Sequence, residues 1–165
     1  MFPRSTGSAM VRSQGGFSLI EVVIVLALIA IITTIAVPAL STSSDAKSVK
    51  GAGNSVASQL AIARTAAIAR DRCATVHLNS SGKLWVTTQA CGGTPIDTLT
   101  SRSLVTAYGV TAKACSGTSC DPDESLDYTF DPRGIPYTQS PATYILTRNA
   151  AADTVNVGQF GRVTR

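Results

Sequence analysis

A single carboxylate stands at the start of an apolar run that is long enough to form a membrane helix. Glu21 is followed by Val22 to Ile32 without one polar residue, and Thr33 and Thr34 are the only polar residues before Pro38. Even on the mild insertion scale, an ionised carboxylate at the centre of a membrane span costs about 2.5–3.5 kcal/mol. We therefore expect this carboxylate to pair with a positive charge. The chain has no Lys or Arg between Phe17 and Asp45, so the charge must come from elsewhere.

The partner that we favour is the α-amine created if the chain is cut between Gly16 and Phe17. The residues around this bond resemble the type IV prepilin signature, which has a short basic leader, a Gly, a Phe, a Leu-Ile-Glu step and about twenty apolar residues. The resemblance implies cleavage after Gly16 by a prepilin peptidase and N-methylation of Phe17. It also implies a filament in which Glu21 of one subunit neutralises the Phe17 amine of a neighbour. The alternative is a plain signal anchor, which has no need of Glu21.

The charge distribution predicts the topology of the uncleaved chain. Residues 1–16 carry Arg4 and Arg12 and no acidic residue, so the positive-inside tendency keeps this leader cytoplasmic and exports everything after Leu40. Residues 17–40 rise about 1.5 Å each, enough to cross a hydrocarbon core about 30 Å thick. We thus expect a single-pass inner-membrane protein with a periplasmic head, which later enters a filament. Pro38 is expected to kink this helix or end its hydrogen-bonded part.

Four cysteines follow the apolar run and none precedes it, which is typical of an exported, disulfide-bonded domain. Four cysteines allow three pairings. Proximity in sequence favours Cys73 with Cys91 and Cys115 with Cys120. The spacing C-x17-C-x23-C-x4-C lacks the close cysteine pairs of usual zinc sites, so we expect neither a metal nor a cofactor.

The exported part reads as a helix followed by a β-rich head, an α+β arrangement in which the helix covers an antiparallel sheet. Residues 41–72 are expected to form an amphipathic helix, because apolar residues recur at intervals of three and four along one stripe: Val49, Ala52, Val56, Leu60, Ala63 and Ala67. Gly51 and Gly53 suggest local flexibility in this helix. Residues 73–165 would form the head, with candidate strands Ala74–Leu78, Leu84–Thr88, Ser103–Tyr108, Leu126–Phe130, Thr143–Thr147 and Thr154–Val157, and with Gln159–Val163 continuing the last. Cys91–Asp97 and Ala112–Glu124 are expected to be loops.

No catalytic constellation is apparent, and we expect no enzyme. The single histidine, His77, lies in a predicted strand without a nucleophile elbow, so a hydrogen-bonded strand histidine is the better interpretation. The acidic run Asp121–Asp127 lacks the Gly and the bidentate Glu of a calcium loop and reads as a solvated turn. Arg64, Arg70 and Arg72 suit the carboxyl end of a helix.

Three segments resemble the minor pilin family that includes FimT and GspH: Ala61–Arg70, Phe130–Pro136 and the closing Gly158–Arg165. This resemblance implies a type IV pilin-like fold and a minor type IV pilin that helps to initiate pilus assembly. The alternative is a minor pseudopilin of a type II secretion system. The expected partners are other pilins or pseudopilins, a prepilin peptidase and the inner membrane.

A further hypothesis is contact with double-stranded DNA, as in natural transformation, through Arg148, Arg162 and Arg165. Arginine suits phosphate because its planar fork makes two hydrogen bonds. The net charge of +4 is no argument for DNA, because two of the positive charges lie in the leader. The alternative is that Arg162 and Arg165 are simply solvated and protect an edge strand from aggregation.

Overall fold

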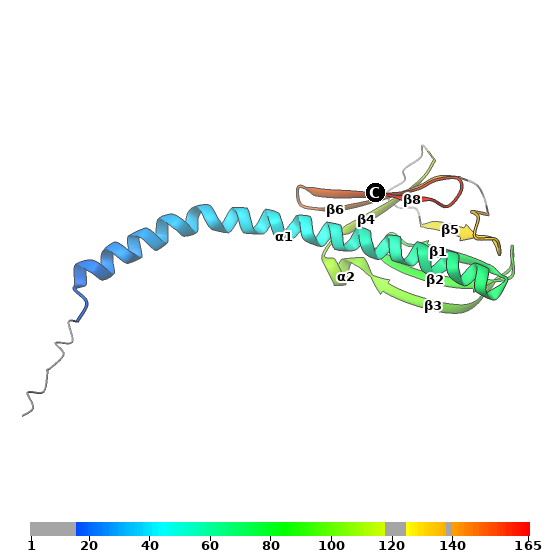
Figure 1. Ribbon diagram of the computed structural model, residues 1–165, viewed down its shortest axis with the longest axis horizontal. Coiled ribbons are helices and arrows are strands. Elements are labelled where there is room, and N and C mark those ends of the chain that lie inside the picture. The colour runs from blue at the N-terminus through cyan, green and yellow to red at the C-terminus, as the bar shows by residue number, and fades with distance from the viewer. Residues whose placement is uncertain (1–15, 118–124, 138–139) are drawn as a thin grey trace, which may run out of the picture. The chain divides into compact units, whose positions relative to one another are not determined.

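The computed structural model describes residues 16–117, 125–137 and 140–165, and within this range the side chains of residues 35–39 are left aside. The chain divides into two compact units, Met1–Ala39 and Leu40–Arg165. Among the described residues, the second unit holds eight strands and the short helix α2 (Figure 1). The described cysteines lie in this unit as well.

Helix α1 runs from Leu19 to Arg70 and crosses the boundary between the units as one continuous element. It does not end at Pro38, so that part of the expectation is wrong. Proline removes one helical hydrogen bond and crowds one carbonyl. The hydrogen bonds of the turns on either side can keep the helix continuous past this point. A bend at Pro38 stays a prediction.

The strands form two antiparallel sheets of four strands each, with the orders β3-β2-β1-β5 and β4-β6-β7-β8. The strands of the first sheet are β1 (Cys73–Leu78), β2 (Lys83–Gln89), β3 (Pro95–Ser103) and β5 (Leu126–Phe130). Those of the second are β4 (Thr111–Ser116), β6 (Ala142–Arg148), β7 (Ala151–Val157) and β8 (Val163–Thr164).

One hydrophobic core joins both sheets to α1. The six residues of the predicted helical stripe are all at most 1% exposed: Val49, Ala52, Val56, Leu60, Ala63 and Ala67. They belong to the same cluster as Val86 and Phe130 of the first sheet and Tyr144 and Leu146 of the second. The α+β expectation is therefore confirmed, and the helical stripe marked the core-facing side correctly.

The predicted strand Ser103–Tyr108 is wrong. Residues Leu104–Tyr108 form the short helix α2, which begins at Ser103 and ends at Gly109. The Ser103 hydroxyl accepts a hydrogen bond from the Thr106 amide, and Gly109 adopts φ 63°, so both ends of the helix are capped. These caps outweigh the strand preference of the intervening β-branched residues.

Both predicted loops also contain a strand, and the last predicted strand is shorter than expected. β3 begins inside Cys91–Asp97 and β4 lies mostly inside Ala112–Glu124. β3 is a largely exposed edge strand, so its sequence lacks the alternation that marks a half-buried strand. In place of the strand Gln159–Val163, a turn closed by the Gly158 amide and the Arg162 carbonyl precedes β8.

Candidate functional site

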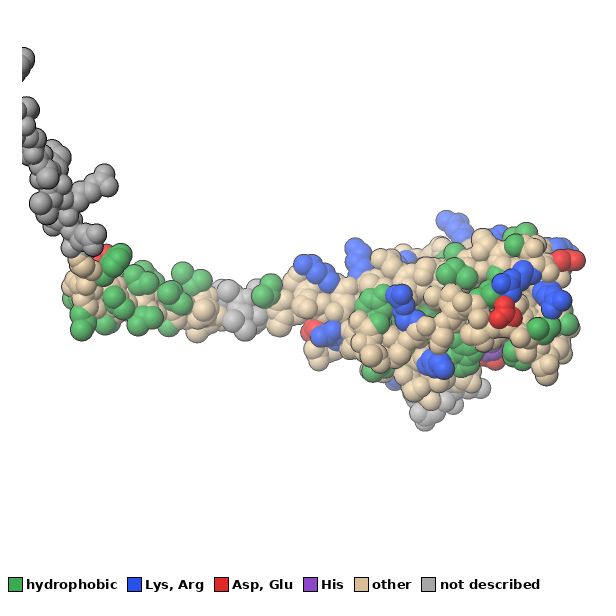
Figure 2. Space-filling view, turned by 90° about the horizontal axis from the view of Figure 1, so that it is seen from below, with side chains coloured by type: hydrophobic (Ala, Val, Ile, Leu, Met, Phe, Trp, Pro, Cys, Tyr) green, Lys and Arg blue, Asp and Glu red, His purple; other side chains and the backbone are tan. Residues whose placement is uncertain are grey.

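The N-terminal segment presents apolar side chains on all sides of the helix. Between Leu19 and Ile32 every large apolar side chain is at least 47% exposed, and these side chains cover the described part of the first unit in Figure 2. The hydroxyls of Thr33 and Thr34 donate to carbonyls of their own helix at 2.7–3.0 Å, so these polar groups need no outside partner. A helix that is apolar all round normally lies buried in an assembly or in lipid.

Glu21 lies in the first turn of α1, where the helix dipole favours a carboxylate. A shallow hollow of about 240 Å³ is lined by Phe17, Glu21, Val22, Val25 and Leu26. Within the described residues this carboxylate has no ion-pair partner. A Cβ added to Gly16 would meet no atom of the described residues within 4 Å, so packing against these residues does not explain this glycine.

Within the part of the chain that the structure describes, no helix combines the length and the hydropathy expected of a membrane span.

The structure brings the three segments that prompted the family resemblance into contact. A Cβ at Gly161 would lie 3.0 Å from Phe130 and 3.3 Å from Pro136, so the closing turn packs directly on the segment Phe130–Pro136. A Cβ at Gly134, which has φ 75°, would lie 2.8 Å from Ile68 of α1. Both turns thus depend on glycine for close approach, and together they join the end of the chain to the carboxyl-terminal part of α1.

Asp131 organises the turn between these contacts. Its Oδ1 accepts the amides of Arg133 and Ile135, each at 2.9 Å, and its Oδ2 accepts the Arg133 guanidinium. Burial alone would raise the pKa of the Asp131 carboxyl, but these hydrogen bonds and the Arg133 charge outweigh it, so the pKa lies below its usual value. Asp131 is therefore a structural anchor that is ionised at neutral pH.

His77 is a hydrogen-bonded strand residue, as the sequence indicated. Its Nδ1 lies 2.7 Å from Asp127 Oδ1, its Nε2 lies 2.8 Å from Thr87 Oγ1, and its ring stacks on Trp85. The order of hydroxyl, imidazole and carboxylate resembles a catalytic triad, but Thr87 is 3% exposed in the middle of β2 and offers no open nucleophile. Among the described residues no cluster of His, Cys, Asp or Glu is suited to a metal ion. Residues 121–124 of the acidic run lie outside the described part.

Cys73 and Cys91 form a disulfide that ties the start of β1 to the turn after β2. This is the pairing that proximity in sequence favoured. Cys115 is also disulfide-bonded, and Cys120, its expected partner, lies outside the described residues.

The three arginines of the DNA hypothesis do not form one cluster. Arg148 pairs with Asp45 at 2.8 Å and donates to the Tyr108 carbonyl, and β7 separates its strand from β8. Arg165 binds Asp153 at 2.5 Å and also donates to the Asn54 side chain and to the Lys50 carbonyl. Two of the three thus hold strands of the second sheet to α1.

Arg162 differs from these two. It is exposed, and within the described chain its guanidinium makes no hydrogen bond or ion pair. It lines a hollow of about 450 Å³ together with Arg64 and with Phe160, which is 80% exposed. The sequence did not single out Arg64 for this surface, because the contact between α1 and the closing turn is made only in the folded chain.

Two family models match this chain. Residues 11–37 match the model of the prokaryotic N-terminal methylation motif, and residues 52–161, more than half of the chain, match that of the type II transport protein GspH. No curated protein sequence matches the chain significantly.

Two solved structures share the fold. The type IV minor pilin FimU of Pseudomonas aeruginosa superposes with a TM-score of 0.54 at 17% identity, over 70% of this chain and 86% of its own. The minor pseudopilin EpsH from the type II secretion system of Vibrio cholerae gives 0.54 at 16% identity, over 72% and 93%. At such identities the likeness shows the fold alone, whereas the family rests on the GspH match. The chain therefore belongs to the GspH family, and its fold is that of type IV pilin-like proteins.

Proposed function

We propose that this protein is a minor type IV pilin that helps to initiate pilus assembly. In this proposal a prepilin peptidase cuts after Gly16, Phe17 is N-methylated, and residues 17–40 hold the subunit in the inner membrane with its head in the periplasm until it joins the filament. The observation that carries the proposal is the exposed apolar surface from Leu19 to Ile32, with Glu21 as its single charge.

Such a surface needs a cover. Burying apolar area is worth about 25 cal/mol per Å², so these side chains favour lipid or the helices of neighbouring subunits over water. Once covered, Glu21 would be a buried charge, and a buried charge without a partner costs several kcal/mol. The Phe17 amine of a neighbouring subunit would supply the opposite charge.

The test is processing and assembly in a host with a prepilin peptidase. Intact-mass analysis should show a chain that begins at methylated Phe17, and Gly16→Val should retain residues 1–16. Glu21→Gln keeps the shape but removes the charge, and should be cut normally yet be lost from sheared filaments. Thr33→Val is the matched control, since its hydroxyl bonds only within α1. A wild-type chain that still begins at Met1 would refute the proposal.

The alternative is a minor pseudopilin, since the matching family model is that of a type II transport protein and the pseudopilin EpsH shares the fold. The resemblance of the closing Gly158–Arg165 to pilus-type members favours the pilus. A deletion strain separates the two: loss of surface pili with normal protein secretion supports the pilin, and the reverse supports the pseudopilin.

As a second activity we propose weak, sequence-independent binding of double-stranded DNA, which would contribute to DNA uptake in natural transformation. What supports it is the exposed Arg162 beside Arg64, while Arg148 and Arg165 are engaged within the head. In mobility-shift titrations, Arg162→Ala should weaken binding and flatten the log–log salt dependence by about 0.9 for each phosphate that the variant no longer neutralises. Arg72→Ala is the control, an exposed arginine that does not line this hollow. Equal binding by both variants would remove the DNA role.

A further inference from the structure

The hairpin of β6 and β7 leaves part of one strand edge open. β7 pairs with β6 along its whole length, whereas β8 pairs only with Asn156 and Val157. The hairpin is closed by the pair of Arg148 and Ala151 across a two-residue loop, so the backbone groups of Ala151 and of every second residue after it bind β6. The N–H and C=O of Ala152 and Thr154 therefore point to the other side, where no strand of the described chain lies.

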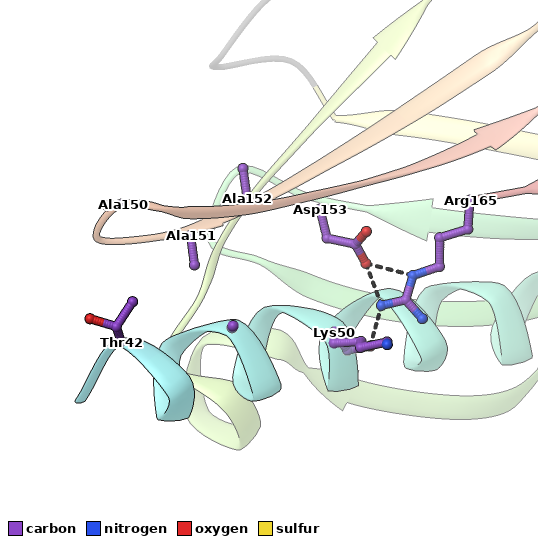
Figure 3. A pocket seen from close by; sticks show the side chains of 8 residues that line it. Thr42, Lys50, Ala150, Ala151, Ala152, Asp153 and Arg165 are labelled. Carbon is purple, nitrogen blue, oxygen red and sulfur yellow. Dashed lines mark hydrogen bonds and ion pairs between the residues drawn. The ribbon is translucent and has the colours of Figure 1, made fainter. Parts of the chain in front are cut away.

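A groove of about 610 Å³ lies beside this open edge. The hairpin contributes Ala150, Ala151 and Ala152, and α1 contributes Thr42 and Lys50, as Figure 3 shows. Ala46 of α1 also lines the groove. Most of these side chains are small, so they leave space next to unpaired backbone groups. Natural proteins usually block an exposed strand edge with charge, proline or a covering segment. Here β8, only two residues long, ends before it reaches Thr154 and Ala152.

The charges at the groove favour an acidic occupant. Lys50 is exposed, and its ammonium group has no partner among the described residues. Asp153 also lines the groove, but the Arg165 guanidinium neutralises it through contacts of 2.5 and 2.6 Å (Figure 3). Lys50 thus leaves one uncompensated positive charge at the open edge.

We propose that this groove docks an extended, acidic segment of a partner protein, which adds a strand to β7. The backbone of the segment would pair with Ala152 and Thr154, small side chains would fill the space above Ala46, and a carboxylate would reach Lys50. In strand addition the main-chain hydrogen bonds supply affinity and the alternate side chains supply specificity. This inference concerns the head and holds for a pilus and for a secretion system alike.

The test measures amide hydrogen exchange in the full-length chain in detergent micelles. The probe is a short peptide with blocked ends, composed of Val, Ala and Thr with one central Glu. The control peptide has the same sequence with Lys in place of Glu. In the free chain, the amides of Ala152 and Thr154 should exchange much faster than those of Ala151 and Asp153. The Glu peptide should slow them about tenfold or more, and the Lys peptide should not.

Variants make the result specific. Ala46→Phe fills the groove and should abolish the added protection, whereas Ser44→Phe, on the exposed side of the same helix, should leave it unchanged. Lys50→Glu should reverse the preference between the two peptides. The proposal fails if Ala152 and Thr154 are already protected in the free chain, if millimolar Glu peptide adds no protection, or if Ala46→Phe binds as well as the wild type.

Discussion

At the scale of single residues, Asp131 contributes more to the head than its place in a turn suggests. It satisfies the amides of Arg133 and Ile135, so Asp131→Ala should lower the free energy of unfolding by about 1–3 kcal/mol at pH 7, the cost of leaving these part-buried donors unpaired. The pKa of Asp131 is lowered from 3.8, so its stabilisation is fully present above that pH and is lost as the pH falls through the lower pKa of the folded state. Urea titrations at pH 7 and at a series of pH values below 3.8 should show that the stability difference between the wild type and Asp131→Ala shrinks. Asp97→Asn, which breaks an exposed ion pair with Arg70, should cost at most about 1 kcal/mol; an equal loss in both variants would contradict the anchoring role.

At the scale of elements, Gly53 lets the end of the chain approach α1. Replacing Gly by Ala inside a helix normally stabilises it by about 1 kcal/mol. Here the new Cβ would overlap Asp153 Oδ2 and lie 3.1 Å from the Arg165 guanidinium. Gly53→Ala should therefore not stabilise the head, because Asp153 and Arg165 must leave their partly exposed ion pair, at a cost of about 1 kcal/mol. The same substitution in an Asp153→Ala background should cost less, and a double-mutant cycle followed by thermal melts measures the difference. A stabilising Gly53→Ala would show that this glycine serves flexibility, as the sequence suggested.

At the scale of the whole molecule, assembly and folding are separable. The core lies wholly within the unit Leu40–Arg165. A chain that begins at Leu40 should therefore melt cooperatively, and Glu21→Ala should leave the melt of the full chain unchanged. A chain that begins at Val49 retains the helical stripe but loses the ion pair of Asp45 with Arg148, whose guanidinium also donates to Ser48. It should melt at a lower temperature, as circular dichroism would show. A non-cooperative melt of the chain from Leu40 would mean that the first unit is required for folding.

The sequence by itself determined the features that depend on neighbours along the chain. Helical periodicity placed Val49, Val56 and Leu60 in the core because α-helical contacts recur every three to four residues. Strands with an apolar side, such as Leu126–Phe130, were recognised because alternate residues of a strand face the same side. The motif around Gly16, Phe17 and Glu21 also needs no fold to be read.

Only the tertiary structure decided what distant segments do together. It made Ser103–Tyr108 a capped helix, assigned β3 to an exposed edge and gave His77 its partners on two other strands. It paired Arg148 with Asp45 and bound Arg165 to the Lys50 carbonyl, so that both arginines contact α1, and it left the β7 edge open beside Lys50. Salt bridges and hydrogen bonds join residues more than a hundred positions apart, and no local pattern encodes such pairings because the free energy that selects them comes from packing the whole core.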